Sequence, residues 1–183
     1  DDLMHLGIFL DAHAVAGDAH LLTQVRDNLQ AFTLDSDVQV ARFAAAVDAF
    51  GSPASWWGRL LGRDGAEQVN LKKAGLFPIV HGVRSLALAQ GIGATSTAER
   101  LDALVAQQVL DPKLGQELQE SLYFLMGLRL QAGLHEWALH RPISGNVDPS
   151  TLSSLERDLL KDTLAVVKRF KAVLHQRLRL DLV

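Results

Sequence analysis

The chain has 183 residues, of which 48% are apolar and 21% charged, the balance of a folded globular protein rather than a disordered one. A formal net charge of −3 gives no overall positive field that would recruit DNA. The absence of cysteine excludes disulfides, thiolate catalysis and cysteine-bound zinc. No apolar run reaches the roughly 18 residues that span a bilayer, so we expect no membrane partner. The lack of cysteine suits a reducing cytoplasm, where we expect this domain to lie.

The beginning of the chain has the pattern of a β-strand. In residues 6–11, apolar side chains alternate from side to side with a period of two, which predicts a short strand ending near His13. Six residues cannot form a sheet alone, so this strand needs partners. The opening Asp1-Asp2, with the first methionine at position 4, resembles the start of an excised piece. We therefore expect residues 1–17 to be the remnant and linker of an upstream domain.

The rest of the chain, residues 18–183, is predicted to be helical. Apolar residues recur there every three or four positions, and glycine, proline or capping residues separate the segments. Asp18 and two Ser-x-x-Glu capping boxes, Ser96 to Glu99 and Ser153 to Glu156, mark helix starts. The predicted helices begin after Gly17, after Ser36, at Pro78, at Ser96, near Leu114 and at Ser153. The sequence thus predicts an all-α, up-and-down bundle of about six helices, preceded by one short strand.

Several motifs resemble functional sites but favour a structural interpretation. His135 and His140 lie one residue too far apart for the zinc-protease pattern, since side chains five positions apart diverge by about 140° on a helix. We expect both to be surface residues and no metal site in the chain. Gly91-Ile92-Gly93 is expected to end a helix rather than bind a dinucleotide. Trp56-Trp57 is either packing under a loop or a stacking platform for a base.

Basic residues stand at two places. The last helix carries Lys168, Arg169, Lys171, His175, Arg177 and Arg179, which we interpret as a solvated face, with anion or membrane-surface binding as the alternative. In the middle of the chain stand Lys72, Arg84, Arg100 and Arg129. Because an unpaired buried charge is very costly, these cations either pair with Glu99 or Glu156, or face a phosphate-binding cleft. Both possibilities stay open at this stage.

These cationic positions lie within a family resemblance that spans nearly the whole chain. The segments LKKAGLFPIV at residues 71–80, RSLAL at 84–88, STAERL at 96–101 and NVDP at 146–149 resemble the putative nucleotidyltransferase substrate-binding domain. Residues 124–131 and 152–161 continue the match. The stretch from Ile8 to Asp18 looks like the last strand of a catalytic domain similar to bacterial uridylyltransferases that modify the PII nitrogen-signalling protein.

The resemblance implies a function in signal transduction. In this family, CBS and cyclic-nucleotide-binding domains often precede the catalytic domain. The parent protein would transfer a nucleotidyl group from a nucleoside triphosphate with Mg²⁺, and this chain would form one wall of the active-site cleft. No cofactor is expected in the chain itself, and as isolated it should not catalyse. The expected partners are the upstream nucleotidyltransferase domain and a nucleotide or protein acceptor.

The candidate site residues follow from the same comparison. We expect Lys72, Arg84, Arg100 and Arg129 to bind substrate, and Asp11 to supply a supporting carboxylate. The rival hypothesis is a non-catalytic signalling or dimerisation module, such as a homodimer, that relays the state of sensor domains. The same apolar stripes and cations would serve either function.

Overall fold

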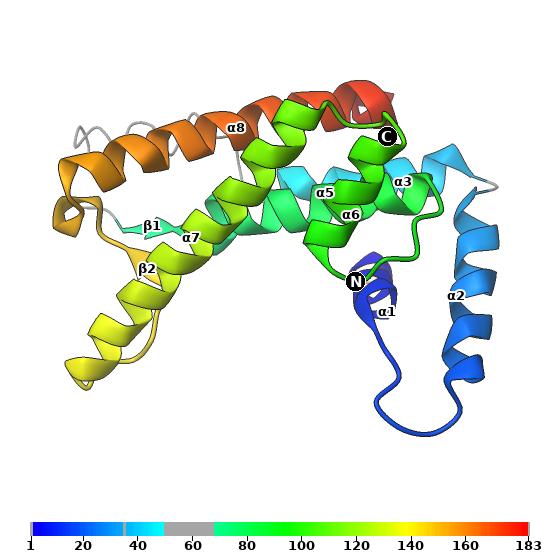
Figure 1. Cartoon of the computed structure of the whole chain (residues 1–183), viewed down its shortest axis with the longest axis horizontal. Coiled ribbons are helices and arrows are strands. Elements are labelled where there is room, and N and C mark those ends of the chain that lie inside the picture. Colours follow the sequence, from blue (N-terminus) through cyan, green and yellow to red (C-terminus); the bar gives the residue numbers. More distant parts are fainter. Residues whose placement is uncertain (1, 35, 50–67, 183) are drawn as a thin grey trace.

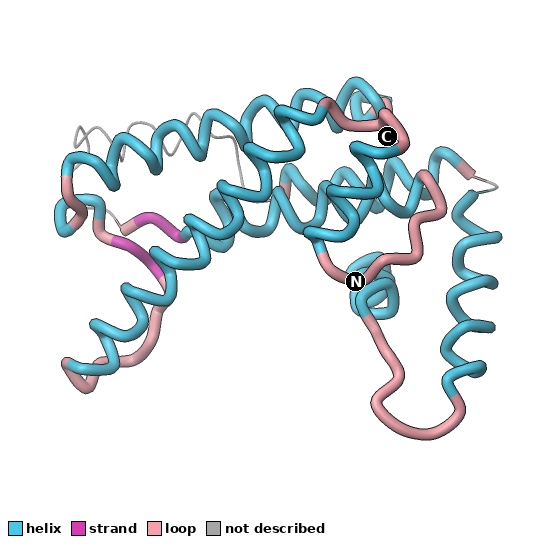
Figure 2. Tube along the Cα trace, viewed as in Figure 1, coloured by secondary structure: helices cyan, strands magenta, loops and turns pink. Residues whose placement is uncertain are grey.

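The computed structural model describes residues 2–34, 36–49 and 68–182. Figure 1 and Figure 2 show an almost entirely helical molecule, so the predicted all-α class is confirmed. A π-helical turn, Lys72–Leu76, leads into the fourth described α-helix, and short 3₁₀ turns follow three other segments. The described α-helices are α1 (Asp2–Asp11), α2 (Ala19–Leu34), α3 (Asp37–Ala44), α5 (Phe77–Ala89), α6 (Thr97–Ala106), α7 (Pro112–Ala138) and α8 (Ser154–Leu178).

The six predicted helices are α2, α3 and α5 to α8, and their start signals act as expected. The Asp18 carboxylate accepts a hydrogen bond from the backbone N–H of His20 at 2.9 Å. At the start of α8, Ser153 and Glu156 form a complete capping box in which each side chain accepts from the other's backbone N–H. Ser96 caps α6 by accepting from the N–H of Glu99, which is one of the two hydrogen bonds of the predicted capping box. Gly91, with φ of 65°, follows the end of α5 as predicted.

The predicted N-terminal strand is wrong, because residues 2–11 form helix α1. No strand in the described residues lies beside this segment, and a helix satisfies its backbone hydrogen bonds within itself. Gly7 is buried and Leu10 half-buried, whereas Ile8 and Phe9 are 68% and 49% exposed. Burial therefore follows one face of a helix rather than alternate residues.

The described residues also form one small sheet. Strand β2 (Asn146–Val147) pairs antiparallel with β1 (Val69–Asn70), and Val69 lies opposite Val147. Both valines are buried, so the pair closes one end of the core. Two residues per strand are too few for an alternating pattern to be visible in the sequence.

Helix α5 is the centre of the molecule and contacts α3, α6 and α8. Ile79, Val83 and Leu86 are at most 1% exposed. Helix α8 approaches closely at Gly82, where an added Cβ would lie 2.5 Å from Leu174. The core is therefore formed by α3 and α5 to α8, while α1 and α2 lie at one end of the molecule (Figure 1).

A buried histidine joins α3 to α5. His81 Nε2 lies 2.7 Å from the Phe43 carbonyl oxygen and donates to it, because a carbonyl can only accept. The rings of Phe43 and Phe77 flank the imidazole. Burial lowers the pKa of His81, so the ring is held neutral. This histidine is a structural part of the core.

The prediction for the Trp56-Trp57 pair falls outside the described residues. In the part of the chain that the structure describes, no helix has the length and apolarity needed to cross a membrane.

Candidate functional site

Two arginines from different helices converge on one carboxylate at the end of α1. Arg84 of α5 donates two hydrogen bonds to the Asp11 carboxylate, one from Nε to Oδ1 at 3.1 Å and one from Nη2 to Oδ2. Arg100 of α6 adds Nη1 at 2.7 Å from Oδ1 and donates from Nη2 to the Leu10 carbonyl oxygen at 2.9 Å. Forked contacts of this kind fix geometry as well as charge. They tie α1 to the core.

The Arg100 side chain is the more deeply buried of the two, with 3% of its surface exposed against 14% for Arg84. Burial lowers the pKa of Arg100, and the charges of Arg84 and Arg26 lower it further, while Asp11 opposes the shift. Burial of Asp11 disfavours its ionised form. The hydrogen bonds from Arg84 and Arg100 outweigh that effect and hold the pKa of Asp11 below its usual value.

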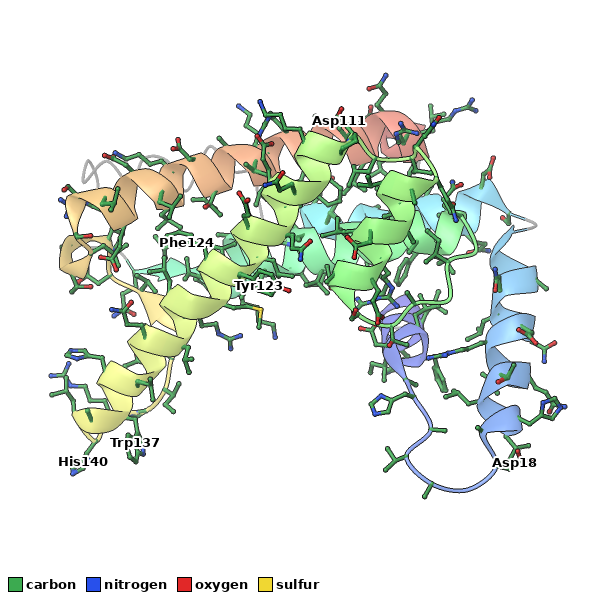
Figure 3. The ribbon with its side chains drawn as sticks, viewed as in Figure 1. Asp18, Asp111, Tyr123, Phe124, Trp137 and His140 are labelled. Atoms are coloured by element: carbon green, nitrogen blue, oxygen red, sulfur yellow. The ribbon has the colours of Figure 1, made fainter. Side chains whose placement is uncertain are left out.

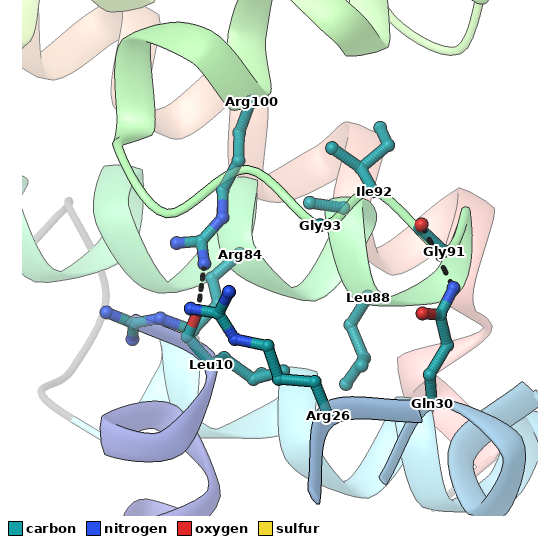
Figure 4. Close-up of a pocket in the computed structure, with 10 residues that line it drawn as sticks. Leu10, Arg26, Gln30, Arg84, Leu88, Gly91, Ile92, Gly93 and Arg100 are labelled. Atoms are coloured by element: carbon teal, nitrogen blue, oxygen red, sulfur yellow. Dashed lines mark hydrogen bonds between the residues drawn. The ribbon is translucent and has the colours of Figure 1, made fainter. Parts of the chain in front are cut away.

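Arg26 of α2 completes a small pocket beside this cluster (Figure 4). The pocket has a volume of about 40 Å³, and Leu88 and Ile92 supply its apolar lining. Arg26 donates to the Ala12 carbonyl oxygen, and Gln30 donates to the Gly91 carbonyl oxygen at 3.0 Å. We call this site the arginine pocket, defined by Arg26, Arg84 and Arg100. Three guanidinium groups against one carboxylate leave an excess of positive charge.

The structure brings together three of the five predicted site residues. Arg84 and Arg100 line the arginine pocket and pair with Asp11 beside it, whereas Lys72 and Arg129 do not line it. Lys72 is exposed on the π-helical turn before α5. Arg129 is exposed on α7, where its Nε lies 2.9 Å from the position that a Cβ on Gly145 would take. Sequence reasoning missed Arg26, because a single cation in an ordinary amphipathic helix carries no signal.

The predicted partners of the arginines were wrong. Arg84 and Arg100 pair with Asp11 and not with Glu99 or Glu156. Glu156 is already engaged in the capping box of α8. Asp11 was assigned to a strand, and only its position at the end of helix α1 brings it to α5 and α6.

The basic stretch of the last helix is only partly solvated. Lys171 is 8% exposed and pairs with Asp48 at 2.6 Å. His175 lies between two carboxylates, with Nε2 at 2.7 Å from Asp48 and Nδ1 at 2.9 Å from Asp181. The hydrogen bond to Asp181, followed by Asp48, raises the pKa of His175 despite partial burial. These cations hold α8 to the turn after α3.

In the part of the chain that the structure describes, no group of three or more histidine and carboxylate side chains is placed so that it could hold a metal ion. His135 and His140 are exposed at the end of α7 and beyond it, as predicted. Both oxygens of Asp11 accept hydrogen bonds from guanidinium groups. Its role as a supporting carboxylate in a metal site therefore stays a prediction.

An apolar stripe runs along the exposed side of α7. Tyr123, Met126, Leu130, Leu134 and Trp137 recur every three or four residues, so they share one face of the helix. Each is between 52% and 69% exposed. In Figure 3, Tyr123 and Trp137 lie along the edge of α7 that faces α1. We call these five residues, with the neighbouring Ile143, the α7 stripe.

A family model described as "Putative nucleotidyltransferase substrate binding domain" matches residues 37–178. This range takes in the whole helical core from α3 to α8, including Arg84 and Arg100. The class that the fold and sequence define is therefore a helical substrate-binding domain. The chain belongs to this nucleotidyltransferase substrate-binding family. Comparison with curated proteins and with solved structures gave no match.

Proposed function

We propose that this domain forms one wall of the active-site cleft of a nucleotidyltransferase, and that the arginine pocket holds a phosphate group there. The observation that carries the proposal is the convergence of Arg26, Arg84 and Arg100 from three helices on one pocket with a single carboxylate. Guanidinium groups bind phosphate oxygens in pairs, and they keep their charge at any physiological pH. Asp11 would then act as an internal anion that occupies the site until substrate arrives.

The size of the pocket limits what it can hold. A volume of about 40 Å³ admits a few water molecules or a phosphoryl-sized group, but no base or sugar. The rest of a nucleotide or acceptor would have to lie outside, against another surface. A pocket of this size suits a wall that closes one side of a cleft better than a complete nucleotide site.

The α7 stripe supports the same proposal, because a wall must dock on its catalytic domain. All six of its residues are more than half exposed, so the stripe leaves a row of large apolar side chains open to solvent. A large exposed apolar patch of this kind is typical of a surface that another protein or domain covers. We propose that the catalytic domain covers the α7 stripe.

The nucleoside triphosphate and Mg²⁺ of such a reaction would be held mainly by that other domain. Magnesium is bound in proteins through one or two carboxylates. No carboxylate of the described chain lines the arginine pocket, and both oxygens of the neighbouring Asp11 accept hydrogen bonds from arginines. The donor set of the described residues around this pocket therefore does not fit a Mg²⁺ site. What these residues can do is hold and orient an anion and neutralise its charge.

Calorimetric titration with pyrophosphate tests the proposal. We expect saturable binding that weakens roughly tenfold in Arg84→Gln, because a charge-assisted contact is worth about 1.5–3 kcal/mol. The matched control is Arg169→Gln, which removes an exposed arginine of α8 that pairs with Glu117 of α7, and it should leave pyrophosphate binding unchanged. If pyrophosphate does not bind, or if both variants weaken it equally, the arginine pocket is not a phosphate site.

The second candidate function is a dimerisation module in signal transduction, and the α7 stripe is the observation that favours it. The same stripe on a second copy could pair with it across a two-fold axis. Light scattering on the purified chain, compared with Leu130→Ser, separates the two. A dimer that Leu130→Ser dissociates favours the dimerisation module. If the wild-type chain and Leu130→Ser are both monomers, the α7 stripe is free to contact a different protein or domain.

A further inference from the structure

A second concave surface lies where α3, the end of α5 and the end of α8 meet, on the opposite side of α5's last turn from the arginine pocket. Its volume is about 640 Å³, and we call it the C-terminal groove. Ala89 and Gln90 line it, while Ala87, Leu88 and Gly91 line the arginine pocket. None of the residues that line one site lines the other.

Three arginines line the C-terminal groove without an ion pair. Arg42 comes from α3, while Arg177 and Arg179 come from the end of α8. All three are exposed, and none has a carboxylate partner within the described part of the chain. Elsewhere on α8, Lys161, Arg169 and Lys171 each have one. The single acid lining the groove, Asp37, lies in the first turn of α3, where the helix dipole already stabilises its charge.

The groove also has an apolar part. Val38 is 51% exposed and Leu182 is 79% exposed, and both line the groove together with Leu178. A ligand that satisfies the surface must therefore carry negative charge and an apolar or planar body. A volume of about 640 Å³ lies within the range typical of small-molecule sites, roughly 300–1,000 Å³.

We propose that the C-terminal groove binds a nucleotide or a similar phosphate ester, with its phosphates on Arg42, Arg177 and Arg179 and its apolar body against Val38 and Leu182. Such a ligand would contact the last turn of α5, whose other side lines the arginine pocket. It would also contact the segment after α8, in which Asp181 binds His175. The groove is thus suited to a regulatory ligand distinct from the substrate.

The test is to titrate isotopically labelled protein with ATP and follow its backbone amide resonances. Shifts should saturate around residues 37–42 and 177–182. The double substitution Arg42→Ala/Arg177→Ala should weaken binding by roughly tenfold or more, because it removes charge-assisted contacts. Leu182→Ser should weaken ATP binding without affecting inorganic triphosphate. Lys168→Ala, an exposed cation of α8 outside the groove, is the matched control.

Other outcomes overturn the proposal. If ATP causes no saturable shift at the groove, nothing of this class binds there. If inorganic triphosphate binds as tightly as ATP and Leu182→Ser has no effect, the arginines act as a general polyanion surface. If an oligoglutamate peptide binds more tightly than ATP, the groove receives an acidic protein segment instead. The two proposals can fail separately, because the groove and the arginine pocket share no lining residue. ATP binding at the groove should therefore persist in Arg84→Gln.

Discussion

Replacing Asp11 with asparagine should destabilise the domain measurably, because it leaves Arg100 without its counter-charge. The Arg100 side chain is 3% exposed, and breaking a buried ion pair from one side costs about 3–5 kcal/mol. The Asp11 side chain, however, is 38% exposed, so water screens the pair. After that discount we expect Asp11→Asn to lower the free energy of unfolding by about 1–2 kcal/mol.

Urea denaturation followed by helical circular dichroism measures this change. In a domain of this size, 1 kcal/mol corresponds to about 2–4 °C in Tm, so thermal denaturation should show a fall of roughly 2–8 °C. Because the pKa of Asp11 is lowered in the folded state, its contribution is present above the usual value of 3.8 and is lost as the pH falls below it. The difference between wild type and Asp11→Asn should therefore shrink in acid.

The matched control is Asp158→Asn. Asp158 pairs with Lys161 on the surface of α8, and its side chain is 70% exposed, so its loss should cost at most about 0.5 kcal/mol. Equal effects of the two substitutions would refute the reasoning, because they would show that the burial of Arg100 adds nothing to the cost of losing Asp11.

Two further predictions concern the core and the end of α8. Gly82→Ala should destabilise the folded domain by roughly 1–3 kcal/mol, because the added Cβ would lie 2.5 Å from Leu174. The control Gly127→Ala should stabilise it by up to about 1 kcal/mol, because a Cβ there meets nothing within 4 Å. Thermal denaturation compares the two variants, and equal Tm values would contradict the close packing of α5 on α8. The pKa of His175 is raised in the folded protein, so its contribution to stability is full below the usual 6.5 and is lost as the pH rises through the folded value. The pKa of Asp48 is lowered, so its contribution to stability is lost in acid. A wild-type stability that does not decline above neutral pH relative to His175→Gln would contradict this pairing.

The helices were predictable because their signals are local. Apolar spacing and capping residues such as Asp18, Ser96 and Ser153 act within a few positions, and all three cap helices in the structure. The prediction for the N-terminal segment was wrong because its alternating pattern favours a strand. In the structure, burial falls instead on residues 6, 7, 10 and 11, which share one face of a helix. The deciding factor, a neighbouring strand, is a tertiary property that a local pattern cannot contain.

The candidate site was only partly predictable for a related reason. Arg84 and Arg100 stood out as cations among apolar residues, which indicates that each needs an anionic partner. Their partner, Asp11, lies 73 and 89 positions away in the chain, and no spacing rule reaches that far. Lys72 and Arg129 were selected as cations in the same way, but both lie elsewhere on the surface. Water solvates an exposed cation, so neither needs a carboxylate partner.

The most direct test of the arginine pocket is the pyrophosphate affinity of Asp11→Asn. In the structure, the Asp11 carboxylate occupies both Arg84 and Arg100, so it competes with any incoming anion. We expect Asp11→Asn to bind pyrophosphate more tightly than wild type and Arg84→Gln to bind it less tightly, at the same ionic strength. Affinity that is unchanged or reduced in Asp11→Asn, in protein that remains folded, would contradict the account that these arginines form a phosphate site.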